Sequence, residues 1–101
     1  MPVEKALKRL GADIRVARIR RRWTVRPVAE RSFVSMATVA RVERGDAAVS
    51  LGIYATVLFV LGLHEGIGTL AAPERDDVGV ALMREGMPKR VRASRRKDLW
   101  T

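Results

Sequence analysis

The chain has 101 residues, of which 48% are hydrophobic, and a formal net charge of +9, so it is long enough for one domain with a core and a short tail. It has no cysteine and one histidine, which excludes disulfides, thiolate-bound metals and a histidine metal cluster. Its longest apolar run, residues 51–63, is shorter than the roughly 20 residues that span a bilayer, and no signal-peptide pattern opens it, so we expect a cytoplasmic protein.

The first predicted helix covers residues 3–22. Apolar side chains recur along it at spacings of three and four and form a stripe: Leu7, Leu10, Ile14 and Ala17. Arginines crowd the C-terminal half of this helix, where positive charge also suits the helix dipole. We expect Trp23 to pack over its end.

Two short helices joined by a tight turn are predicted next, over residues 25–45. Thr24 is placed to cap the first helix through the N–H of Arg26, because Pro27 has no N–H to offer. Ser35 is placed to cap the second helix through its hydroxyl. Gly45 ends that helix, because glycine tolerates a left-handed stop.

The second of these helices has two contrasting faces. Val39 and Val42 share one face, which can pack against the rest of the chain. The other face carries a small side chain and two guanidinium groups, those of Ala37, Arg41 and Arg44. This layout suits a helix that lies in a DNA major groove.

The residues of this region form a recognisable pattern. It reads Ala29-Glu30, then Ser35-x-x-Thr38-Val39-x-Arg41-Val42-Glu43-Arg44-Gly45, with Leu10-Gly11-x-x-Ile14-Arg15-x-x-Arg18 upstream. Over residues 10–70 the chain resembles the helix-turn-helix signature of the Xre/Cro repressor family. It departs from the family in the turn, where Phe33 stands in place of the usual glycine. A bulky residue there either costs strain in a left-handed conformation or requires a different turn.

The resemblance implies an all-α fold, a lambda-repressor-like DNA-binding domain of five helices, and a homodimer on a palindromic double-stranded operator. We expect this helix-turn-helix domain at residues 1–72. A C-terminal extension, a short helix followed by a basic and disordered tail, would occupy residues 73–101. An arginine and a glutamate that pair in proteins with this signature correspond here to Arg18 and Glu43, which we interpret as a structural pair.

The resemblance also implies which side chains meet DNA. The start of the second motif helix reads base edges, which gives Met36, Ala37 and Arg41. Arginine matches guanine O6 and N7, whereas the other two make only apolar contacts and are alternatively plain helix surface. Phosphates, which position the protein without reading sequence, would be held by Thr24, Arg26, Ser35, Thr38 and Arg44.

A further helix is predicted over residues 51–61, capped by Ser50 and ended by Gly62. It is apolar nearly all round, so every face of it has to be covered. Because a chain this short has few other elements, the simplest cover is a second copy of the protein. The dimer contacts would then include Tyr54, Phe59 and Val60.

The remainder predicts a helical turn over residues 64–70, a break at Ala72-Pro73 and a last helix from Asp76 or Asp77 to about residue 85. His64 is expected to be a surface or capping residue. Trp100, near the end of the basic tail, is a candidate docking residue for a partner, because tryptophan often anchors interfaces. Alternatively it folds back onto the same chain.

Charge and motifs limit the function. Nine basic and two acidic residues give residues 1–26 a net +7, residues 27–83 carry −3 and residues 84–101 carry +5. Two basic ends coinciding with the helix-turn-helix pattern favour a nucleic-acid partner over a merely solvated surface. No motif supports catalysis, so we expect neither an enzyme nor a cofactor.

The end of the chain narrows the family further. The ending Leu82-x-x-Glu85-Gly86-Met87-Pro88-Lys89-Arg90-Val91-Arg92, after residues 50–62, looks like the HipB-like branch of the family. Members of that branch are antitoxins that bind a HipA-like kinase toxin and repress their shared operon. The alternatives are a solitary repressor, one tied to a different toxin, or a basic RNA-associated protein. The scarcity of aromatic residues argues against RNA.

Overall fold

The structure is a computed structural model that describes residues 1–86, and all the regular elements in that range are helices. They are α1 (Pro2–Arg20), α2 (Val25–Ser32), α3 (Met36–Glu43), α4 (Leu51–Val60), the short 3-10 helices η1 (Glu65–Thr69) and η2 (Pro73–Arg75), and α5 (Asp77–Arg84). The all-α prediction is therefore confirmed. The predicted tail from residue 89, with Trp100, lies outside the described residues.

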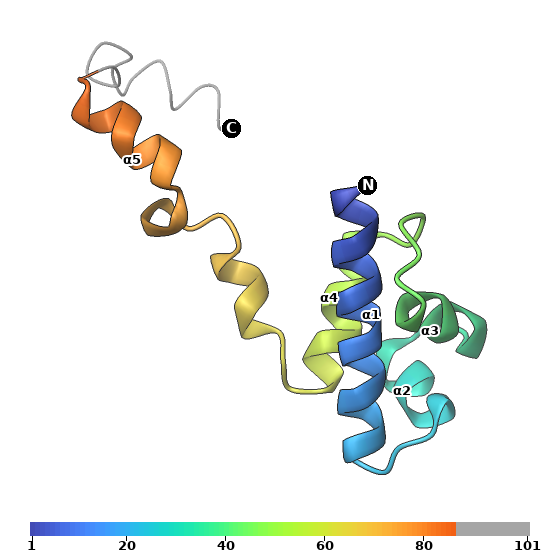
Figure 1. Ribbon diagram of the computed structural model, residues 1–101. Helices are drawn as coiled ribbons and strands as arrows, with labels where there is room; N and C mark the ends of the chain where they lie inside the picture. The colour runs from blue at the N-terminus through green and yellow to red at the C-terminus, as the bar shows by residue number, and fades with distance from the viewer. Residues whose placement is uncertain (87–101) are drawn as a thin grey trace. The chain divides into compact units, whose positions relative to one another are not determined.

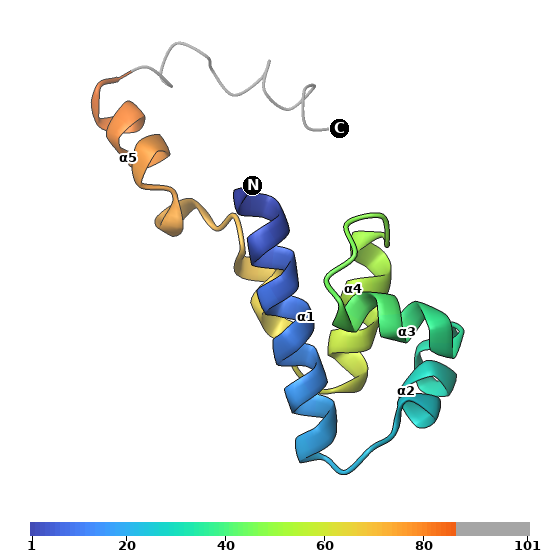
Figure 2. The ribbon, with the colours of Figure 1, turned by 45° about the vertical axis from the view of Figure 1, so that its right-hand side comes forward.

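Helices α1 to α4 enclose one hydrophobic core. Its fully buried side chains are Ile14 of α1, Val28 of α2, Val39 and Val42 of α3, and Val57 of α4. Figures 1 and 2 show α2 and α3 on the same side of α1. Because α3 contributes two of these five residues, the core fixes its orientation and decides which of its faces meets solvent.

Two glycines let α1 approach the end of α3. A Cβ added to Gly11 would lie 2.6 Å from the carbonyl oxygen of Val42. A Cβ added to Gly45 would lie 2.5 Å from the carbonyl oxygen of Leu7, and Gly45 also has a φ of +74°. Both distances are too short for a side-chain carbon, so backbone packs directly on backbone here.

The turn between α2 and α3 is built as it would be with glycine. Phe33 has φ 58° and ψ 38°, in the left-handed region. The N–H of Val34 donates to the carbonyl of Ala29, and that of Phe33 donates to Glu30, which is the usual pattern of a helix ending in a left-handed residue. Of the two alternatives for this turn, the chain has taken the strained one, with 93% of Phe33 exposed.

Helix α4 buries one face within the protomer, and Tyr54, a predicted dimer contact, lies on that buried face. Tyr54 is only 2% exposed, and its hydroxyl donates to the backbone oxygen of Asp46 at 2.8 Å. It packs in the protomer core together with Val57 and Leu58, and a second copy has no access to its ring. The apolar run contributes to this core on one face, while Leu51 and Phe59 remain 66% and 63% exposed.

Chain contacts divide the protein after Ile67 into two compact units. In the described part of the second unit, residues 68–86, no side chain of η2 or α5 is buried. The carboxylate of Asp76 caps α5 by accepting the N–H of Gly79 at 2.9 Å. The prediction of a domain boundary after residue 72 stays a prediction.

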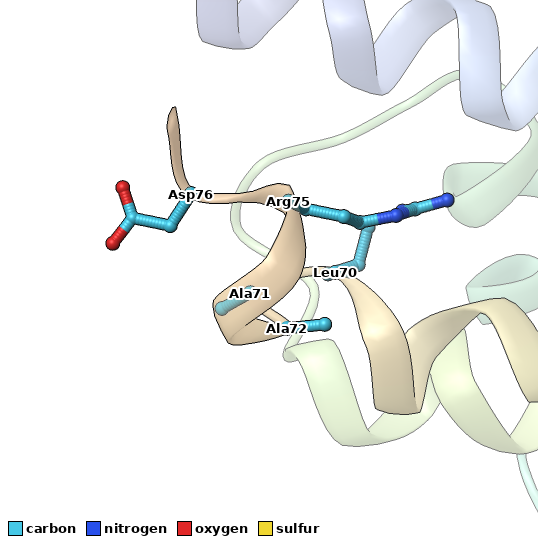
Figure 3. Close-up of a pocket in the computed structure, with 5 residues that line it drawn as sticks. All are labelled: Leu70, Ala71, Ala72, Arg75 and Asp76. Carbon is cyan, nitrogen blue, oxygen red and sulfur yellow. The ribbon is translucent and has the colours of Figure 1, made fainter. Parts of the chain in front are cut away.

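A shallow hollow of about 310 Å³ lies next to η2 in this second unit (Figure 3). Its lining residues are Leu70, Ala71, Ala72, Arg75 and Asp76. The two charged side chains point in opposite directions, so their polar groups do not converge on a ligand position. In residues 1–86, no helix is long and apolar enough to cross a membrane.

Candidate DNA interface

Helix α3 presents a polar face opposite its buried one. Val39 and Val42 are fully buried, whereas Ala37 and Arg44 are exposed and Arg41 is half-buried. At 100° per residue these last three lie on one side of the helix, away from α1 and α2. The structure therefore brings together the predicted base reader Arg41 and the predicted phosphate contact Arg44 on a single outer face.

The start of α3 is fixed by its own side chains. The hydroxyl of Ser35 accepts the N–H of Thr38 at 3.0 Å, and the two hydroxyl oxygens lie 2.9 Å apart. Ser35 is thus the N-cap that the sequence predicted. Met36, at the first position of the helix, is exposed beside this cap. Any phosphate bound here by Ser35 or Thr38 would be held by hydroxyls that already stabilise the helix.

The start of α2 differs, because it lacks the capping hydrogen bond that was predicted for the Thr24 side chain. Thr24 occupies the N-cap position in an extended conformation, but its side chain makes no capping hydrogen bond. Its hydroxyl therefore does not serve the helix. Thr24 and Arg26 are both exposed at this helix start, where the backbone N–H groups of an α-helix and its dipole favour an anion.

Arg18 and Glu43 form a nearly buried ion pair between α1 and α3. Arg18 Nε donates to Glu43 Oε2 at 2.6 Å, and Nη2 donates to Oε1 at 3.0 Å. A third donor, Nη1, reaches the backbone oxygen of Trp23 at 2.8 Å. The hydrogen bond to Glu43 raises the pKa of Arg18 above its usual value. This pair joins α3 to α1, and breaking it from one side would leave a nearly buried charge without its partner.

A contact that the sequence analysis missed links Arg41 to the loop after α3. Arg41 Nε donates to Asp46 Oδ2 at 3.0 Å. Asp46 Oδ1 also accepts the N–H of Ala48 at 2.8 Å. Both hydrogen bonds lower the pKa of Asp46, and the one from the Ala48 N–H has the larger effect. The hint in the sequence is an acidic residue directly after Gly45, which lies in a loop and so belongs to no periodic pattern.

Two further predicted site residues, Phe59 and Val60, lie on α4. Phe59 is 63% exposed, and its ring meets the edge of His64 at 5.0 Å between centroids. Val60 is half-buried on the same helix. Within residues 1–86 no three His, Asp or Glu side chains gather as a metal site.

Comparison with known families agrees with this geometry. A family model described as a helix-turn-helix domain matches residues 9–67, which is more than half of the chain. Comparisons with curated proteins and with solved structures found no match. The matched residues contain α2, α3 and their turn, together with α4 and most of α1. The chain belongs to the helix-turn-helix domain family, as an Xre-like DNA-binding regulator.

Proposed function

We propose that the protein is a sequence-specific transcriptional repressor of the cytoplasm, with α3 lying in the major groove of its operator. The observation that carries the proposal is the outer face of α3, where Ala37, Arg41 and Arg44 point away from a core that fixes the opposite face. In this role Arg41 reads guanine, while Met36 and Ala37 contact apolar base edges such as the thymine methyl.

Phosphate contacts would come from the starts of the two motif helices and from the end of α3. The residues are Thr24, Arg26, Ser35, Thr38 and Arg44. The unused hydroxyl of Thr24 and the exposed guanidinium groups of Arg26 and Arg44 support this assignment. We take residues 1–72 as the DNA-binding domain and residues 73–101 as an extension.

A homodimer on a palindromic operator would place two α3 helices one turn of DNA apart, about 10 bp. With Tyr54 removed from the dimer contacts, Phe59 and Val60 remain as the candidates on α4. The exposed Phe59 ring supports this choice, since large exposed apolar side chains favour association. A monomer in light scattering at micromolar concentration would contradict it.

The finer proposal is that the protein is the antitoxin of a HipA-like kinase toxin and represses the operon of both. Its support is the similarity of the chain's ending to the HipB-like branch, and the position of Trp100 near the end of a basic segment. Purification of the full chain with co-purifying proteins identified by mass spectrometry tests this. Recovery of a kinase-like protein is the expected result, and its absence would favour a solitary repressor.

Selection from a random duplex library, followed by fluorescence anisotropy on the selected site and on a scrambled duplex, tests the DNA-binding role. Arg41→Ala should cost roughly 1–3 kcal/mol on the selected site and little on the scrambled one. Arg44→Ala is the matched control and should weaken both alike, with a smaller salt dependence. Equal losses on both duplexes from Arg41→Ala would exclude a reading role, and tighter binding to single-stranded RNA would favour the RNA-associated alternative.

A further inference from the structure

Among residues 1–86, the guanidinium of Arg41 is held at one position only, its Nε. The bond to Asp46 Oδ2 measures 3.0 Å and uses the single hydrogen of Nε. The side chains of the pair remain 42% and 32% exposed. The four hydrogens on Nη1 and Nη2 of Arg41 are therefore still available for a bound molecule.

Asp46 is itself fixed by four further hydrogen bonds. Its Oδ1 accepts the N–H of Ala48 at 2.8 Å, and its own N–H donates to the carbonyl of Arg41 at 3.0 Å. Its carbonyl oxygen accepts the hydroxyl of Tyr54 at 2.8 Å, from within the core, and also the N–H of Val49 at 3.3 Å. Asp46, whose carboxylate meets Arg41, is thus tied to α3, to its own loop and to α4.

A fixed carboxylate on Nε has a definite chemical consequence. An arginine can offer guanine O6 and N7 either Nε with one terminal nitrogen or the two terminal nitrogens together. Asp46 occupies Nε and leaves the second, end-on arrangement. It also removes part of the freedom that this long side chain would otherwise lose when it binds DNA, which is a gain from pre-organisation.

We propose that Asp46 is a positioning residue that sets Arg41 for end-on recognition of guanine and thereby increases sequence specificity. The inference rests on the proposed function, because it acts through base reading by Arg41. The negative charge of Asp46 also increases specificity by a second route. It weakens the attraction of this face for the phosphates of non-specific DNA.

The alternative is that the ion pair with Asp46 keeps Arg41 from contacting DNA. The two alternatives predict different ratios of the affinities for selected and scrambled DNA. If Asp46 positions Arg41, removing its charge lowers the ratio of affinities for selected and scrambled DNA. If it withholds Arg41, removing its charge raises affinity for the selected site at least as much as for scrambled DNA, so the ratio is unchanged or higher.

The test uses the full-length protein, a duplex selected by the unaltered protein from a random library, and a scrambled duplex of equal length. Asp46→Asn keeps the size of the side chain and an oxygen that can accept the N–H of Ala48. It removes the negative charge that Asp46 presents to Arg41. We expect the affinity ratio to fall about three- to tenfold, with affinity for scrambled DNA equal or higher. Thermal melting of the variant checks that it is folded.

The same substitution in an Arg41→Ala background completes the design. There Asp46→Asn should leave the affinity ratio unchanged, because the positioned side chain is gone. An unchanged or raised ratio for Asp46→Asn alone, with a lowered ratio for Arg41→Ala, would overturn the positioning role and leave the proposed function intact. An unchanged ratio for Arg41→Ala would overturn both.

Discussion

The two ends of α3 are held in opposite ways. At the C-terminal end, Gly45 meets the backbone of α1 directly, and Glu43 is paired with Arg18. At the N-terminal end, Phe33 and Ser35 are exposed, and Ser35 is bonded only to the first turn of its own helix in the described hydrogen bonds. The helix is therefore anchored at one end and presented at the other.

Both ends of α3 contain a residue with positive φ. Comparing them separates two structural requirements, a left-handed backbone conformation and the absence of a side chain at a close backbone approach. Gly45 has φ 74° and Phe33 has φ 58°. A side chain at position 45 would meet the backbone of α1, whereas that of Phe33 extends into solvent. A left-handed conformation alone can be borne by phenylalanine at some cost in strain, but a close backbone approach excludes every side chain.

The largest expected effect is that of Gly45→Ala. The new Cβ would lie 2.5 Å from the carbonyl oxygen of Leu7, so α1 has to move, and the residue is strained as well. We expect a loss of about 3–4 kcal/mol in the free energy of unfolding, measured by urea denaturation.

Gly62→Ala is the matched control for that substitution. Gly62 has φ +80°, but a Cβ there would meet no atom within 4 Å. Strain alone should then cost about 1 kcal/mol. Similar losses from the two substitutions would contradict the distinction between strain and close approach.

The next effect is that of Glu43→Gln, which leaves the nearly buried guanidinium of Arg18 without its counter-charge. We expect a loss of about 2–3 kcal/mol in the free energy of unfolding, since breaking one side of a buried pair exposes the cost of desolvation. Replacing both partners, as in Arg18→Met with Glu43→Leu, should cost less than this single change. A single-variant loss under about 0.5 kcal/mol would mean that the pair behaves as a surface ion pair.

The anchored end of α3 was the more predictable from sequence. The resemblance to the Xre/Cro signature implied the pair of Arg18 and Glu43, and this pair joins α1 to α3. The covering of α4 was not predictable, because a run of apolar residues has the same appearance whether its cover comes from the same chain or from another. Asp46 was missed for a similar reason, since a loop acid five residues after Arg41 has no periodic signal.

At the presented end, Ser35→Ala should have a smaller effect. It removes the acceptor of the Thr38 N–H, one of the amides that the first turn of a helix cannot satisfy internally. We expect a loss of about 1 kcal/mol in the free energy of unfolding. Ser35→Asp should restore most of it, because aspartate also caps a helix start. A loss that aspartate does not restore would assign the effect to something other than the cap.

The smallest effect has the opposite sign. Phe33→Gly relieves a left-handed residue whose side chain is 93% exposed and so contributes little packing. Glycine also gains freedom in the unfolded chain, which offsets part of this relief. The net result should be a gain of about 0.5 kcal/mol in the free energy of unfolding.

Phe33→Asn is the control for this change, because asparagine tolerates the left-handed region better than other residues with a side chain. It should fall between phenylalanine and glycine in the same denaturation experiment. A destabilised Phe33→Gly variant would mean that the exposed ring stabilises the turn more than its backbone strains it. The presented end would then be held by side-chain contacts as well, and the contrast between the two ends of α3 would be smaller than the geometry indicates.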